Sequence, residues 1–160
     1  MATDRGSPVP PALDPEAVPA RTGSAYPEAF RDRCAGRSKQ ALGDALGLKH
    51  FGVNLVRLEP GHWSSMRHWH TCQDEFVYVI EGELVLVTGG GEQTLRAGMA
   101  AGFRAGAADG HHLQNRSPAP AVYLEVGDRL PGDEVCYPDV DLAAQQVQTW
   151  MYTHRNGDLY

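Results

Sequence analysis

The chain has 160 residues, of which 42% are hydrophobic, and its formal net charge is −6. This length corresponds to one domain with one core, and the lack of clustered Lys and Arg argues against nucleic-acid binding. No apolar run approaches the roughly 18 residues of a membrane span, and the first residues lack the apolar centre of a secretory signal. We therefore expect a cytoplasmic protein that contacts neither nucleic acid nor membrane.

The first 30 residues are rich in proline, with prolines at positions 8, 10, 11, 15, 19 and 27. Because proline lacks an N–H and fixes φ, this segment can form neither a helix nor a central strand. We expect a flexible, extended arm over residues 1–20, disordered up to about residue 12, and a single domain over residues 21–160. Residues 37–49 fit either a short helix or a bent strand with glycine breaks.

From residue 50 onward, short segments rich in Val, Leu and aromatic residues alternate with turn residues. The segments are HFGVNLVRL at 50–58, FVYVIEG at 76–82, ELVLV at 83–87 and AVYLEV at 121–126. Many short strands at close spacing indicate an all-β sandwich or barrel. The pair Asn156-Gly157 is a strong hairpin signal and predicts two terminal strands, the second very short.

The segment 61–82 contains His68, His70 and Glu75. Side chains alternate faces along a strand, so the two histidines point the same way and Trp69 points the opposite way. The residues between His70 and Glu75 suffice for a turn that brings the carboxylate beside the imidazoles. Two imidazoles and a carboxylate this close together are suitable ligands for a divalent transition metal.

The cysteines are Cys34, Cys72 and Cys136, and their spacing fits no zinc knuckle or CxxC pair. An odd number without a signal peptide argues for free thiols. Cys72 lies two residues past His70. We interpret it as an inert thiol beside the site, with substrate contact or redox control as the alternative.

The pattern of His68, His70, Glu75 and Gly82 resembles the first motif of the cupin superfamily, and Gly98, Gly106, His111 and Asn115 resemble the second. The strings FGVNLVRLEPG, DEFVYVIEGE and YLEVGDR extend the likeness to small single-domain bacterial cupins, over roughly residues 20–160. The sequence departs from the pattern in two places. Arg104 stands where proline is usual, and the interval from Gly106 to His111 is lengthened.

The resemblance implies an all-β fold, the double-stranded β-helix or cupin jelly-roll barrel, here with an extended proline-rich N-terminal arm. It also implies one divalent metal ion per chain, which could be Fe, Mn, Ni, Co or Zn. The ligands would be His68, His70, Glu75 and a fourth histidine. Three residues separate His111 from Asn115, as in the family pattern, so we choose His111 over His112.

Strand parity places three apolar substrate-contacting candidates in the interior: Met66, Val77 and Val79. Arg104, in the loop before His111, could offer a cation to an acidic substrate, or be a solvated arginine. Arg67 faces away from the histidines, which favours a structural salt bridge. Gln73 or Asp74 could hydrogen-bond a ligand histidine.

The resemblance permits several reactions of a small oxygen-rich metabolite: dioxygenation, isomerisation or epimerisation, and lyase chemistry. The sequence therefore predicts a metal-dependent enzyme. The alternatives are a non-catalytic small-molecule-binding module of the sensor type, or a structural barrel. By analogy with small cupins we also expect a homodimer, with the arm and Trp69 as candidate contacts.

Overall fold

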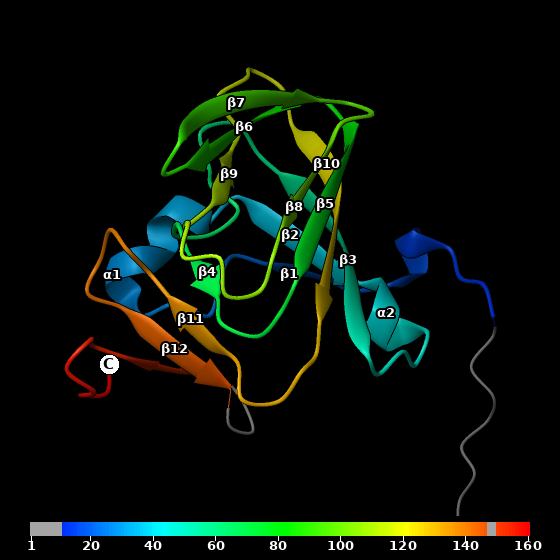
Figure 1. Cartoon of the computed structure of the whole chain (residues 1–160). Coiled ribbons are helices and arrows are strands. Elements are labelled where there is room, and N and C mark those ends of the chain that lie inside the picture. Colours follow the sequence, from blue (N-terminus) through cyan, green and yellow to red (C-terminus); the bar gives the residue numbers. More distant parts are fainter. Residues whose placement is uncertain (1–10, 147–149) are drawn as a thin grey trace, which may run out of the picture.

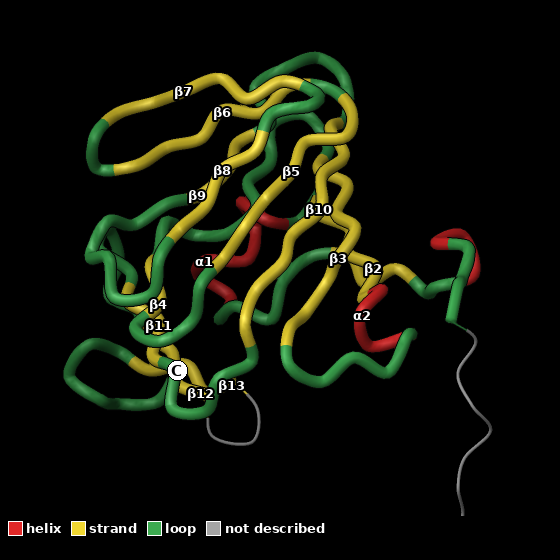
Figure 2. Tube along the Cα trace, turned by 45° about the vertical axis from the view of Figure 1, so that its right-hand side comes forward, coloured by secondary structure: helices red, strands yellow, loops and turns green. Residues whose placement is uncertain are grey.

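The computed structural model describes residues 11–146 and 150–160 (Figure 1). Within them the chain forms three antiparallel sheets around one interior. The large sheet has the order β1-β2-β3-β10-β5-β8. Its strands are β1 (Ala20–Thr22), β2 (Arg37–Ala41), β3 (Phe51–Leu58), β10 (Ala121–Asp128), β5 (Glu75–Glu81) and β8 (Ala100–Phe103). Figure 2 shows β10, β5 and β8 running together along one wall.

Two smaller sheets complete the barrel. The first has the order β7-β6-β9 and consists of β7 (Gly91–Arg96), β6 (Glu83–Thr88) and β9 (His112–Gln114). The second has the order β13-β12-β11-β4 and consists of β13 (Trp150–Thr153), β12 (Ala143–Gln146), β11 (Glu134–Cys136) and β4 (Trp69–His70). The helices are single turns: η1 (Pro15–Ala17), α1 (Glu28–Arg31), η2 (Asp32–Cys34) and α2 (Leu42–Ala45). These sheets confirm the predicted all-β double-stranded β-helix.

Apolar side chains fill one part of the interior, because alternate residues of the strands point inward. This main core consists of Val56, Leu58, Val77, Val79, Leu84, Leu86, Leu95, Leu113, Ala121 and Tyr123. A second cluster packs the N-terminal segment against the β11–β12 sheet: Tyr26, Cys34, Met66, Val135, Tyr137, Leu142 and Ala144. The part of the interior that the main core leaves open holds the polar residues described below.

The turn between β5 and β6 depends on a glycine. Gly82 has a φ of +77°, a conformation that other residues adopt only with strain. A Cβ atom at this position would lie 2.9 Å from the Pro120 carbonyl oxygen. The glycine that closes the first motif is therefore required by backbone geometry.

The segments with ambiguous sequence signals combine several elements. Residues 37–49 form both of the expected alternatives, a strand (β2) followed by a single helical turn (α2). The predicted arm is described only from residue 11, and the expectation that the proline-rich segment forms no helix is wrong there: η1 and the start of α1 lie within it, with prolines at or before their first residues, where no N–H is needed. The Gln40 side-chain amide donates to the carbonyls of Pro15 and Val18. At the C-terminus, β13 is followed by a bridge between Thr153 and Leu159 across the expected turn. No helix among the described residues has the length and apolar character needed to cross a bilayer.

Candidate metal centre

Backbone pairing brings the two motif segments together. His68 and His111 exchange both backbone hydrogen bonds, at 3.1 and 2.8 Å between nitrogen and oxygen. Residues paired in this way project their side chains on the same face. His70 lies in β4, opposite Val135 of β11, and Glu75 begins β5. The four predicted ligands therefore come from separate strands and a bridge.

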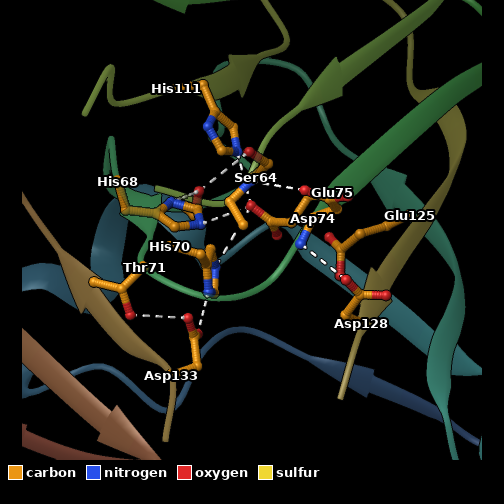
Figure 3. Close-up of polar contacts among 12 residues, drawn as sticks. Ser64, His68, His70, Thr71, Asp74, Glu75, His111, Glu125, Asp128 and Asp133 are labelled. Carbon is orange, nitrogen blue, oxygen red and sulfur yellow. Dashed lines mark hydrogen bonds and ion pairs between the residues drawn. The ribbon is translucent and has the colours of Figure 1, made fainter. Parts of the chain in front are cut away.

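The imidazoles converge on one carboxylate oxygen (Figure 3). Glu75 Oε2 lies 3.0 Å from His111 Nε2, 3.5 Å from His70 Nε2 and 3.6 Å from His68 Nε2. The ligand atoms of His68, His70 and Glu75 all lie within 4.8 Å of one another. The structure thus brings together all four residues that the sequence singled out as metal ligands.

Contacts at the other ring nitrogen fix the tautomers of two histidines. His68 Nδ1 lies 2.9 Å from the Met66 carbonyl oxygen, and His70 Nδ1 lies 2.5 Å from Asp133 Oδ2. Because each partner is an acceptor, each Nδ1 carries the proton and donates it. The Nε2 lone pairs of both histidines are therefore free and directed toward Glu75.

Asp133 supports His70 on the side of the ring that faces away from Glu75. Its side chain is 0% exposed, and its second oxygen accepts hydrogen bonds from the Cys72 N–H at 2.9 Å and the Thr71 hydroxyl at 3.4 Å. A carboxylate that orients a ligand histidine is the usual support of a metal site. Sequence reasoning missed Asp133, because it lies far along the chain in the turn before β11 and no local motif marks it.

The choice between the two adjacent histidines is decided by side-chain direction. The His111 ring stacks on Phe103, with 3.5 Å between ring centroids and 1° between planes. His112 instead contacts the Ser65 carbonyl through Nδ1 at 3.0 Å and packs against Trp63. Burial lowers the pKa of His112 to about 4, so this imidazole is neutral and belongs to the protein interior.

The histidines stabilise the ionised form of Glu75. Burial alone raises the pKa of Glu75, but the contacts with His111 and His68 and the nearby histidine charges outweigh it, so the pKa lies well below its usual value. Burial lowers the pKa of His68, yet the contact with Glu75 raises it overall. Glu75 Oε2 is buried and makes no hydrogen bond of acceptable geometry with the described residues.

These residues fit a bound divalent metal. Inward-facing imidazole lone pairs and an ionised carboxylate repel one another unless a positive charge lies between them. Neutral imidazoles and a carboxylate suit Mn, Fe, Co, Ni or Zn. Such a donor set leaves positions free for substrate oxygens.

The cluster borders a cavity of about 690 Å³. Met66, Val77 and Val79 all face inward and belong to the two apolar clusters, but of the three only Val77 also lines the cavity. The polar residues on its wall include Arg37, Lys39, Asn54, Tyr123 and Glu125. These strands carried no motif, so only the fold reveals their shared position.

Arg104 lies on another side of the cluster. It lines a smaller pocket of about 170 Å³ that also touches His70, Glu75 and His111. Arg104 therefore adjoins the ligands without lining the large cavity.

The remaining motif residues support the backbone. Arg67 forms an ion pair with Asp139 at 2.6 Å, which confirms its predicted structural role. Asp74 accepts a hydrogen bond from the Ala105 N–H, and Gln73 donates to the Leu130 carbonyl. The carboxylate that contacts His70 Nδ1 is Asp133, and a contact between Gln73 and a ligand histidine stays a prediction.

Residues 54–127 match the family described as Cupin domain. The chain is similar to the crystal structure of a cupin-superfamily sugar phosphate isomerase from Silicibacter pomeroyi, with 46% identity, a TM-score of 0.90, and coverage of 94% of this chain and 96% of the other. A candidate sugar phosphate isomerase from Acidithiobacillus ferrooxidans shows 31% identity and a TM-score of 0.69 over 75% and 77% of the two chains.

A curated relative is the tetracenomycin polyketide synthase protein TcmJ from Streptomyces glaucescens. It is 31% identical over 87 residues, which are 54% of this chain and 56% of TcmJ. The match thus spans little more than half of that protein. Together with the fold and the converged motifs, the similarities show that the chain belongs to the cupin superfamily.

Proposed function

We propose that this protein is a metal-dependent enzyme that acts on a small oxygen-rich metabolite, with isomerisation or epimerisation as the favoured reaction. The observation that carries the proposal is the convergence of three imidazoles on the buried oxygen of Glu75 beside a cavity of about 690 Å³. Cavities of this size suit small-molecule ligands.

The similarities favour isomerisation over the dioxygenase and lyase alternatives. The Silicibacter pomeroyi protein, described as a sugar phosphate isomerase, matches over nearly the whole chain. The cavity wall also offers hydroxyl, amide, carboxylate and cationic groups, a mixture suited to a polyhydroxylated compound.

The roles of the residues follow from their positions. His68, His70, Glu75 and His111 would hold the metal, which when bound supplies a Lewis acid for neighbouring substrate oxygens. Asp133 keeps the Nδ1 proton on His70 and so leaves Nε2 free to bind. Phe103 fixes the plane of His111 by stacking.

Metal content is the first test. The untagged protein, purified anaerobically, should contain about one divalent transition metal per chain by elemental mass spectrometry, and His70→Ala should lose it. Asp141→Asn is a matched control, because Asp141 contacts only the C-terminal segment. If neither the native protein nor the reconstituted protein holds metal, the proposal is wrong.

Reaction type is the second test. Incubating the metal-loaded protein with aldose and ketose phosphates in deuterated water should incorporate deuterium at the carbon next to the carbonyl. Tight binding of one compound without exchange or turnover would instead support the sensor-type binding module.

We also propose a homodimer. The alternate residues Phe76, Tyr78 and Ile80 of β5 point away from the interior and are 44%, 40% and 41% exposed. A row of exposed apolar side chains on a sheet face is typical of an interface. Light scattering that finds only a 17.4 kDa species would reject the dimer.

A further inference from the structure

Two glycines stand beside Glu75 on the wall of the cavity. In the strand register, Glu75 of β5 pairs with Gly127 of β10, which pairs with Gly52 of β3. Both glycines line the cavity. The guanidinium of Arg129 lies over Gly52 and also lines the cavity, so a ligand that extends from the metal centre along this wall meets a cation there.

Polar side chains stand in the next row along the same wall. Glu125 pairs with Val77 on one side and with Asn54 on the other. Glu125 Oε1 accepts hydrogen bonds from Lys39 Nζ at 2.6 Å and from Asn54 Nδ2 at 3.2 Å. The side chains of Lys39 and Glu125 are 29% and 24% exposed, and both line the cavity.

Glu125 is ionised although it lies in the interior. Burial raises the pKa of its carboxyl, but the charge of Lys39 and its hydrogen bond lower that pKa overall. One oxygen, Oε1, accepts the hydrogen bonds from both side chains. Glu125 can therefore still accept a hydrogen bond from a ligand hydroxyl through Oε2.

Tyr123 adds a buried hydroxyl that lies close to the hydroxyl of Ser64. Its side chain is 0% exposed and lines the cavity, and its Oη has no hydrogen bond of acceptable geometry among the described residues. Tyr123 lies in one row with Val56 and Lys39, across β10, β3 and β2. Ser64 lines the same cavity, so the two hydroxyls add donors and acceptors to this part of the wall.

We propose that Lys39, Asn54, Tyr123 and Glu125 form a hydroxyl-binding subsite for a polyhydroxylated carbonyl or carboxylate compound whose other end is held at the metal centre. The inference rests on the proposed function, and it narrows the substrate class to sugars and sugar acids. The subsite combines donors with an ionised acceptor, the pair of partners that a hydroxyl group requires. An apolar or aromatic substrate would remove water from the Lys39–Glu125 ion pair and supply no hydrogen bond in exchange.

A comparison of two hydroxamate ligands tests binding at the subsite independently of binding at the metal centre. Acetohydroxamate chelates a metal through two oxygens, and erythronohydroxamate adds a chain of hydroxyl groups to the same chelating unit. Calorimetric titration of the zinc-loaded full chain should give erythronohydroxamate about tenfold higher affinity, the equivalent of one or two net hydrogen bonds.

The variants Tyr123→Phe and Glu125→Gln should bring the ratio of the two affinities close to one, without changing the affinity for zinc or acetohydroxamate. Tyr78→Phe is the matched control, because Tyr78 lies on the outer face of β5, and it should keep the ratio. Tyr123→Phe keeps the buried ring and removes only the hydroxyl, and urea unfolding of this variant checks that a lost ratio does not come from a lost fold.

The outcomes distinguish the two proposals. If the wild type takes up zinc and binds acetohydroxamate but shows a ratio near one, the subsite is rejected and the metal centre stands. A ratio that survives in both variants also rejects the subsite. If the wild type takes up no zinc or other divalent metal, the proposed function itself fails.

Discussion

Replacement of Asp133 by asparagine tests how strongly the metal centre depends on its support. Asp133 accepts from His70 through one oxygen and from the Cys72 N–H through the other. In the Asp133→Asn variant one of these acceptors becomes an NH₂ donor. Whichever way the amide turns, a donor then faces either the His70 N–H or the Cys72 N–H, and one buried hydrogen bond is lost.

The expected magnitude follows from this loss. Removing the partner of a ligand histidine typically lowers metal affinity by about 10- to 100-fold, which corresponds to about 1.4–2.7 kcal/mol. The metal-free protein should also lose about 1–3 kcal/mol of unfolding free energy, because the position is fully buried and a donor remains unpaired.

Competition with a chromophoric zinc chelator measures the affinity, and urea unfolding with and without zinc measures the stability. The control Asp141→Asn also replaces a carboxylate that contacts a histidine, but one that is distant in sequence from the ligands and exposed. It should leave zinc affinity unchanged. If Asp133→Asn binds zinc within about twofold of the wild type, Asp133 does not orient His70 and our reasoning is refuted.

Three further results are expected. Gly82→Ala should lower the unfolding free energy by about 2 kcal/mol or more, and Gly132→Ala by about 1 kcal/mol. Both glycines have positive φ, but only a Cβ at position 82 would meet a backbone oxygen. Equal losses for the two variants in urea unfolding would contradict this. Arg104→Ala should raise the KM for an acidic substrate, and an unchanged KM would remove the predicted cation role. The hydrogen bond and charge of Arg67 hold the pKa of Asp139 below its usual value. The ion pair therefore stabilises the fold at any pH above the pKa that Asp139 has in the unfolded chain, and this contribution is lost as pH falls through the pKa of Asp139 in the folded protein. Because Asp139 is half exposed, the unfolding free energies of the wild type and of Asp139→Asn should differ by less than about 1 kcal/mol at neutral pH. This difference should shrink below about pH 4. A difference that does not change with pH would exclude the ion pair as its source.

The sequence by itself determined the fold class and the four candidate ligands. Strand periodicity is local, so alternation in segments such as 76–82 indicates an inward and an outward face before any partner strand is known. The same rule placed His68 and His70 on one face, and the structure brings both onto Glu75. Parity also placed Val77 at the cavity.

The alternation of side chains along a strand could not predict which inward-facing residues line the cavity and which pack in the core. Met66, Val77 and Val79 all face inward and belong to apolar clusters, yet only Val77 among them also reaches the cavity. Whether an inward residue meets a ligand or another side chain depends on what stands opposite it. Gly127 and Gly52 stand in register with Glu75 on the cavity wall, and no local pattern records that pairing.

Only the tertiary structure revealed the groups that orient the site and extend it. Asp133 lies 63 residues from His70, and Lys39 lies 86 residues from Glu125. Neither contact has a sequence signature, because hydrogen bonds between distant strands depend on sheet order and register. The sequence thus determined which residues could bind a metal, while the barrel's closure decided which polar groups face the ligand beside it.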